Sequence, residues 1–178
     1  LLSGVTCGVV GSYIVARRMV FLCGGITHAS FGGLGVALYM GVNPIFGAML
    51  FASFSSLGIE FASRKGRIRE DSAIGIIWSV GMALGALFMS LRPGYATDLT
   101  SYLFGNILLV THSDVLWLAM LTIFIVLGSL LSLRYVMFIT FDEDFARSQG
   151  VATTLTAYIM SILIAVTIVL SIKVMGIV

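Results

Sequence analysis

The chain alternates between long apolar stretches and short polar breaks. Six stretches carry few or no charges and approach or reach the length of about 20 residues that a helix needs to cross a bilayer core. These stretches are residues 1–16, 19–41, 45–62, 72–91, 115–133 and 154–172. Each is apolar throughout, whereas strands of a membrane barrel alternate apolar and polar residues over about ten positions. The pattern therefore predicts an all-α integral membrane protein, a polytopic helix bundle of about six spans.

Turn residues and charges mark the breaks between these stretches. Asn43-Pro44 predicts a short turn, and Arg92-Pro93-Gly94 ends the fourth stretch. The most polar segment, 64–71, separates the third stretch from the fourth. Segment 95–114 has an apolar centre too short to span a bilayer, so it predicts a short surface helix or a re-entrant helix.

Composition agrees with a lipid environment. Hydrophobic residues make up 59% of the 178 residues and charged residues only 10%, and the mean hydropathy is +1.10. Soluble domains carry about 25% charged residues. The net charge of +2 is small and the basic residues are scattered, so no nucleic-acid partner is indicated. Cys7 and Cys23 have no close spacing, so neither a disulfide framework nor a zinc motif is indicated.

The ends of the sequence interrupt this pattern. The first residues are already apolar, and the last ones stop within an apolar run. We therefore interpret residues 1–178 as a single transmembrane domain that is a piece of a longer protein, and we expect further spans at both ends.

The distribution of basic residues predicts an orientation. If the 64–71 loop is cytoplasmic, alternation of the spans places eight of the ten basic residues on that side. The eight are Arg17, Arg18, Arg64, Lys65, Arg67, Arg69, Arg134 and Arg147. Only Arg92 and Lys173 fall on the other side, so the opposite orientation would invert the rule.

Glycine is frequent inside the spans rather than only in the breaks. Small residues recur four positions apart, for example Gly25, Ala29 and Gly33, a spacing that lets two helices approach closely. Close packing is one interpretation of the dense cluster from Gly24 to Gly35. The other is a helix that is broken or bent where a pathway is lined.

His28 is the main candidate for chemistry. It lies ten residues beyond Arg18, or about 15 Å along a helix, which places it near the bilayer midplane. Ionisable residues at this depth usually mark ion or substrate paths, and imidazole is a common ligand of zinc, manganese and iron. The structural alternative is a neutral histidine that donates to a carbonyl of the next helix. Glu60, one turn before Arg64, is expected to reach the interface.

Two polar segments outside the spans are further candidates. Asp98, His112 and Asp114 follow the fourth stretch on the predicted outer side. They could attract a cation or meet a delivery protein, or they could be ordinary residues of a solvated loop.

On the inner side, residues 141–151 contain a candidate short helix. Asp142 predicts its N-cap, acidic residues its first turn, and Gly150 its end. Such a helix would show Phe145 and Ala146 beside charged residues, as a docking surface or as a plain amphipathic linker.

No set of residues for catalysis is present in the sequence. It lacks a phosphate-binding glycine loop followed by Lys and Ser or Thr, and also a Ser/His/Asp set and an HExxH motif. The scarcity of carboxylates within the spans also argues against a proton-coupled carrier. An enzyme is therefore a weak hypothesis.

Four segments resemble the permeases of metal-ion ABC transporters, which import zinc, manganese or iron. They read RRMVFLCGGITHASFGGLGVALYMGVNPIFGA, RIREDSAIGIIWSVGMALG, DLTSYLFGNILLV and FDEDFARSQGV, and they follow the family's order over nearly the whole chain. The resemblance implies a multi-pass permease domain of a bacterial cytoplasmic membrane. It also implies a homodimer, separate cytoplasmic ATPase subunits and an extracytoplasmic metal-binding protein, with no permanently bound cofactor.

The resemblance also assigns roles to residues of this sequence. The family's pathway histidine corresponds to His28. The cytoplasmic helix that couples to the ATPase corresponds to Asp142, Glu143, Phe145, Ala146, Arg147 and Gly150. One position departs from the family pattern, because the acidic residue usual four positions before the histidine is replaced by Gly24. This departure leaves the metal open, and it leaves a permease for a metal chelate or a cobalamin-type ligand as the alternative. A carrier outside the ABC class is the more distant alternative.

Overall fold

Seven helices form the part of the chain that the computed structural model describes, residues 1–66, 68–91 and 110–175. They are α1 (Leu2–Ala16), α2 (Val20–Met40), α3 (Pro44–Arg64), α4 (Glu70–Ser90), α6 (His112–Phe141), α7 (Glu143–Ser148) and α8 (Thr153–Met175). Five of them, α2, α3, α4, α6 and α8, are long and apolar enough to cross a membrane. The remaining predicted span, residues 1–16, corresponds to α1, which has 15 residues and a length of about 22 Å. The all-α polytopic bundle is thus confirmed.

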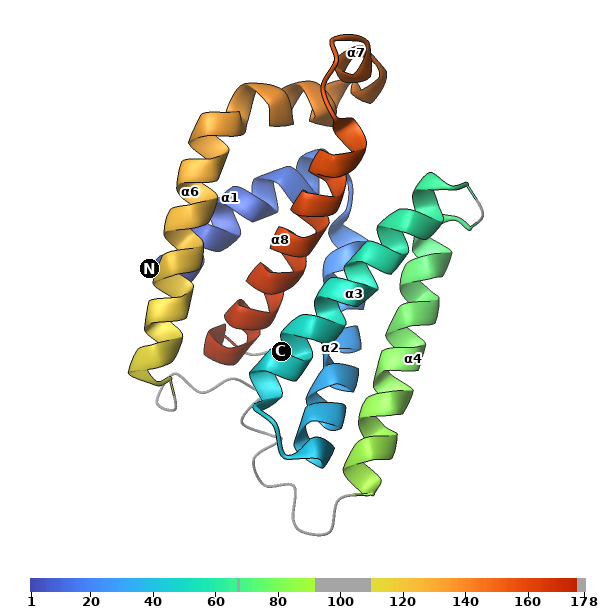
Figure 1. Ribbon diagram of the computed structural model, residues 1–178, viewed down its shortest axis with the longest axis vertical. Helices are drawn as coiled ribbons and strands as arrows, with labels where there is room; N and C mark the ends of the chain where they lie inside the picture. Colours follow the sequence, from blue (N-terminus) through green and yellow to red (C-terminus); the bar gives the residue numbers. More distant parts are fainter. Residues whose placement is uncertain (67, 92–109, 176–178) are drawn as a thin grey trace.

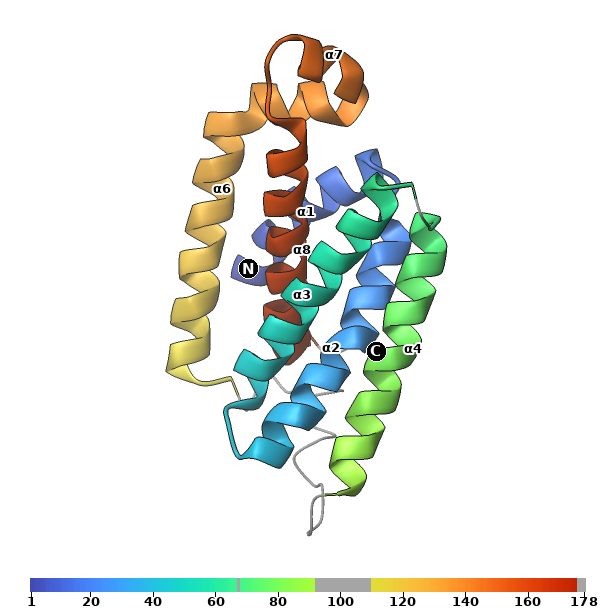
Figure 2. The same ribbon diagram turned by 45° about the vertical axis from the view of Figure 1, so that its right-hand side comes forward.

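The bundle has two parts that meet along α3 and α8. Helix α2 packs between α3 and α4, while α1 packs against α6, and α8 contacts α3 as well as α1 and α6. Figures 1 and 2 show that α7 lies at the end of the bundle where α6 joins α8. The α1–α2 and α3–α4 turns lie toward the same end. The chain thereby brings Arg17, Arg64 and Arg147 to one end, as the alternation of spans predicts.

Small residues let the backbones of α2 and α4 approach closely. A Cβ atom added to Gly81 would lie 2.6 Å from the Cα of Ala29, and one added to Gly35 would lie 2.7 Å from the carbonyl oxygen of Gly85. Helix α2 is continuous from Val20 to Met40. A break in this helix is therefore not found, and the packing interpretation is confirmed, because neighbouring helices occupy the space that side chains would need. The lining of a pathway by these glycines stays a prediction.

Helix α6 is longer than the sequence predicts. It begins three residues before the predicted stretch 115–133 and ends eight residues after it. Thr111 and Asp114 form a capping box that fixes the start. In Figure 1, the last part of α6 turns away from the bundle axis and runs across its end toward α7. The Ser132 hydroxyl donates to the carbonyl of Gly128 (2.6 Å), a type of bond that bends helices.

Segment 95–114 lies mostly outside the described residues. The predicted surface or re-entrant helix and Asp98 fall in the range 92–109, so they stay predictions. The end of that segment is described, and it forms the cap and the first turn of α6.

Candidate functional site

His28 lies on α2 and faces α4, where its ring stacks on the indole of Trp78. The two ring centroids are 4.4 Å apart and the planes differ by only 7°. Phe21, two turns earlier on α2, approaches the same indole with a centroid distance of 6.3 Å. Both His28 and Trp78 are half-buried. The side chain is therefore oriented by an aromatic contact, which is typically worth about 0.5–1.5 kcal/mol beyond the buried area.

The ring nitrogens of His28 remain available. Within the described ranges, no hydrogen bond joins the imidazole to another residue, so the structural alternative of a bond to a neighbouring carbonyl is not found. Stacking covers one face of the ring, while a metal ion binds a nitrogen in the ring plane. The geometry is thus compatible with a transient ligand.

The surroundings of His28 offer few other ligands. No group of three His, Cys, Asp or Glu side chains comes together in the described part of the chain. The hydroxyls of Thr27 and Ser30 donate to the carbonyls of Cys23 and Thr27 at 2.8 and 2.6 Å, which leaves only their lone pairs for a ligand. At Gly24, an added Cβ would contact the Trp78 ring at 3.9 Å. A single imidazole next to an indole is therefore the described arrangement, rather than a closed metal centre.

The predicted outer residues have different surroundings. His112 is exposed as the first residue of α6. The Asp114 carboxylate caps α6 and also forms an ion pair with Lys173 Nζ of α8 at 2.5 Å. Asp114 is therefore not an isolated negative charge. Sequence reasoning missed this pairing, although alternation of the spans had placed both residues on the outer side.

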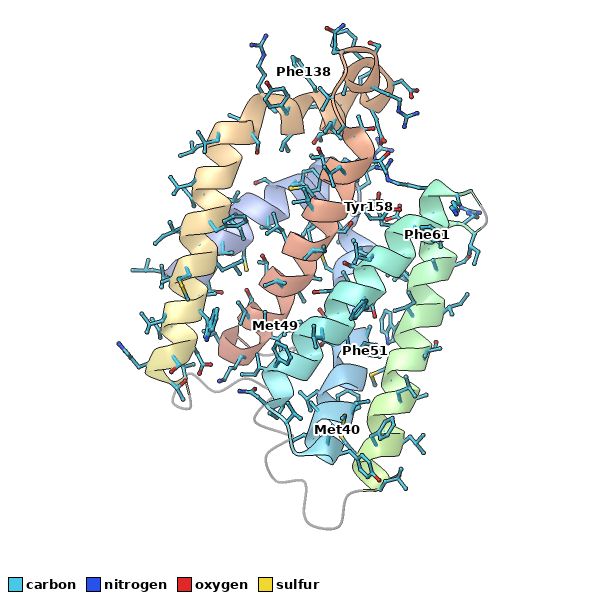
Figure 3. All side chains as sticks on the ribbon, viewed as in Figure 1. Met40, Met49, Phe51, Phe61, Phe138 and Tyr158 are labelled. Carbon is cyan, nitrogen blue, oxygen red and sulfur yellow. The ribbon has the colours of Figure 1, made fainter. Side chains whose placement is uncertain are left out.

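The predicted short inner helix is present as α7. The Asp142 carboxylate accepts from the backbone N–H of Phe145 at 2.8 Å, and Gly150 has a φ of +78°, a conformation that favours glycine. Ala146 is completely buried within the chain. Phe145 is half-exposed and meets Phe138, labelled in Figure 3, edge to face at 6.0 Å. Of these two apolar residues, only Phe145 offers surface to a partner, and Ala146 contributes through internal packing.

Glu143, the first residue of α7, forms ion pairs with three arginines. Its carboxylate pairs with Arg64 at 2.8 Å, with Arg17 at 3.4 Å and with Arg147 at 3.6 Å. Burial alone would raise the pKa of Glu143, but the hydrogen bonds and charges of Arg64 and Arg17 together hold this pKa below its usual value. The residue pattern alone showed Glu143 as a first-turn acid of a short helix and gave no sign of this network. Two of its partners, Arg17 and Arg64, lie 126 and 79 positions away along the chain.

Comparison with known proteins decides the family. The model of the ABC 3 transport family matches residues 1–178. The chain belongs to the ABC 3 transport family. Membership confirms the resemblance to metal-ion ABC permeases, and with the five long apolar helices it supports a multi-pass protein of a bacterial cytoplasmic membrane.

Curated relatives of this ABC 3 family chain carry transport names. It is 35% identical over 182 residues to a probable metal transport system membrane protein of Chlamydia trachomatis, covering 99% of the chain and 62% of the relative. It is 32% identical over 179 residues to the manganese transport system membrane protein MntC of Halalkalibacterium halodurans, covering 100% and 61%. The chain thus spans about three fifths of the length of these relatives.

A solved structure shares the fold of the ABC 3 family chain. PsaBC from Streptococcus pneumoniae in complex with Fab superposes with a TM-score of 0.82 at 27% identity. The match covers 99% of this chain and 63% of that one. The described helices are therefore arranged as in the corresponding part of that solved structure.

Proposed function

We propose that the chain is the membrane-spanning part of an ATP-driven importer of divalent metal ions, with Mn²⁺ as the first candidate and Zn²⁺ and Fe²⁺ as the others. Family membership and the relatives named for metal or manganese transport support this proposal. In this proposal the ion is the cargo and not a resident cofactor.

The observation that carries the proposal is the position of His28. It lies near the middle of the most enclosed span, α2, with its ring held flat on Trp78 and its nitrogens without a partner in the described residues. A permeating ion needs ligands that bind weakly enough to release it, because tight binding at the midplane would trap the ion. One imidazole meets that requirement better than a complete set of ligands would.

The partners follow from the two ends of the bundle. We assign α7, at the basic end, to the contact with a cytoplasmic ATPase subunit, since this chain has no nucleotide-binding motif of its own. The opposite end, where α6 begins at His112, is assigned to an extracytoplasmic metal-binding protein. Two copies of the permease would enclose the path as a homodimer.

Reconstitution tests the proposed function. The full-length permease, its ATPase and its metal-binding protein are placed in proteoliposomes, and uptake of radiolabelled Mn²⁺ is followed with and without ATP. We expect the uptake of Mn²⁺ to depend on ATP. Unlabelled Zn²⁺ and Fe²⁺ should reduce this uptake to different extents. His28→Ala should abolish uptake without reducing membrane insertion.

The control variant is Ser79→Ala. Ser79 is an exposed residue of α4 next to Trp78, and its hydroxyl donates to the Gly75 carbonyl of the same helix. This variant should transport Mn²⁺ as the wild type does. Uptake of an Fe³⁺ chelate in place of free Mn²⁺ would favour the chelate permease. Normal Mn²⁺ uptake by His28→Ala would remove His28 from the path.

A further inference from the structure

Glu143 lies at the centre of an ion-pair network that joins segments far apart in the sequence. Arg17 follows the end of α1, Arg64 is the last residue of α3, and Glu143 is the first residue of α7. The exposed fractions of these three side chains are only 19–25%. Pairs that are this far removed from water are stronger than pairs on an open surface. Arg147, with 61% of its side chain exposed, is a weaker fourth member.

The network extends beyond these pairs. The Arg64 Nε donates to Glu60 at 2.5 Å, and the other oxygen of Glu60 accepts from the Ser161 hydroxyl of α8 at 3.3 Å. Arg17 also donates to the carbonyl of Ile139 near the end of α6 at 3.1 Å. The network therefore links α7 to α1, α3, α6 and α8.

Two routes lead from this network to the helix that carries His28. Arg17 lies three residues before the start of α2, and the connection turns at Arg18, whose φ is +58°. Arg64 ends α3, and α3 packs on α2 so closely that a Cβ on Gly47 would lie 2.6 Å from the Gly33 carbonyl. A displacement of α7 that carried Arg17 and Arg64 with it would therefore move both the start of α2 and the helix beside it.

We propose that Glu143 is a positioning residue that transmits the movement of α7 to α2 through Arg17 and Arg64, rather than a contact with the ATPase. This inference rests on the proposed function, because it requires α7 to be the helix that the ATPase moves. The side chain points into the bundle end, toward its arginine partners, while Phe145 supplies the exposed apolar surface of the same helix.

The experiment compares coupling with docking in the reconstituted complex. Mn²⁺ transported per ATP hydrolysed and the recovery of ATPase bound to the permease are measured for Glu143→Gln, Arg64→Gln and their double variant. Each single variant should lower the transport ratio about tenfold, within the usual range of coupling between sites, while ATPase recovery stays at the wild-type level. The double variant should lower the ratio by less than the product of the two single effects, since both single variants remove the pair between Glu143 and Arg64.

Matched variants separate positioning from general damage. Lys65→Gln removes a positive charge from the exposed residue next to Arg64 and should leave the ratio unchanged. Glu143→Asp and Arg64→Lys keep their charges and should recover part of the ratio. Loss of ATPase recovery in Glu143→Gln but not in Arg64→Gln would overturn the proposal and make Glu143 a docking contact.

A second measurement does not depend on transport. Spin labels at Ser148→Cys and Lys65→Cys, in a background without Cys7 and Cys23, report the distance between α7 and the end of α3. Glu143→Gln should broaden this distance distribution, and an unchanged distribution would overturn the proposal. If the wild-type complex shows no ATP-dependent Mn²⁺ uptake, the proposed function fails, and the label distances alone decide whether Glu143 holds α7.

Discussion

The imidazole of His28 is oriented by a flat contact with Trp78, and this has consequences for how an ion could pass. A hydrogen bond to one nitrogen would fix the ring and occupy a ligand position, whereas stacking restricts the ring and leaves both nitrogens open. Because the contact comes from α4, the orientation of the ring depends on the packing of α2 against α4. Under the proposed function, Trp78 positions the ligand His28 and does not itself need to bind the ion.

We predict that Trp78→Ala weakens Mn²⁺ uptake less than His28→Ala does. Loss of a stacking contact worth about 0.5–1.5 kcal/mol should raise the Mn²⁺ concentration for half-maximal uptake by about 2- to 12-fold. Trp78→Phe should keep this concentration close to the wild-type value, because a phenyl ring can also stack on His28. Uptake kinetics in proteoliposomes check this order, and a Trp78→Ala variant as inactive as His28→Ala would assign the indole a larger role.

Of the two stacked residues, the sequence alone pointed to His28 but not to Trp78. His28 stands out because an ionisable side chain interrupts a long apolar stretch at midplane depth. Trp78 carries no such signal, since an aromatic residue within an apolar span is the ordinary case, and it lies 50 positions further along the chain. The Asp114–Lys173 pair escaped for the same reason, because it joins the ends of two helices that meet only in the fold.

At the scale of elements, the close contact between α2 and α4 depends on glycines, whose lack of a side chain lets the two backbones approach. An added Cβ on Gly81 would meet backbone atoms of Ala29, which cannot rotate away as a side chain could. Gly75, on the same helix, has open space where its Cβ would be. The two glycines therefore form a matched pair with opposite expectations.

We predict that Gly81→Ala destabilises the bundle by about 1–3 kcal/mol, because the two helices must separate to accommodate the methyl group. Gly75→Ala should be neutral or slightly stabilising, since alanine favours the helix more than glycine does. Thermal unfolding of the purified protein in detergent measures both variants. Equal midpoints for Gly81→Ala and the wild type would show that the interface can relax without cost.

The attachment of α7 gives a prediction about pH. The pKa of Glu143 is lower in the folded chain than the ordinary glutamate value of 4.5. The stabilising contribution of its ion pairs is therefore complete above that ordinary value, and it is lost as the pH falls through the lower pKa of the folded state. We expect the distance between labels on α7 and α3 to be constant from neutral pH to about pH 5 and to broaden below the ordinary value.

Glu143→Gln serves as the control for this titration. In this variant the distribution of label distances should already be broad at neutral pH. Acidification should then broaden it little further, because position 143 no longer carries a group that titrates. A wild-type distribution that broadens between pH 7 and 6 would contradict the ion pairs as the attachment of α7, because a carboxylate with a lowered pKa does not titrate there.

Elements with a strong local signal were predictable, and their boundaries were not always so. The caps of α7 follow from Asp142 and Gly150, whose preferences for these positions are local. The end of α6 was missed because Arg134 interrupts the apolar run, although the helix continues past it to Phe141. Residues 135–141 beyond Arg134 are again mostly apolar, so the single charge interrupts the apolar run and does not mark the end of the helix.

For the whole molecule, the separation of charge between the two ends predicts the orientation in the membrane. Arg17, Arg64 and Arg147 meet at the end that carries α7, whereas Lys173 and Asp114 neutralise each other at the opposite end. A net basic end next to a nearly neutral one follows the positive-inside rule. In the proposed importer, the ATPase and the metal-binding protein act on opposite sides of the membrane, so this orientation also decides which end each of them can reach.

Labelling of single cysteines in intact cells tests this orientation. In a background without Cys7 and Cys23, we expect a membrane-impermeant maleimide to modify Val42→Cys, at the exposed α2–α3 turn, directly. Lys65→Cys and Ser148→Cys should react only after the membrane is made permeable, since both lie at the basic end. If Lys65→Cys reacted in intact cells and Val42→Cys did not, α7 would face outward, away from any ATPase. His28 would keep its depth in that case, but the ATP-driven movement of α2 through α7 would have no source.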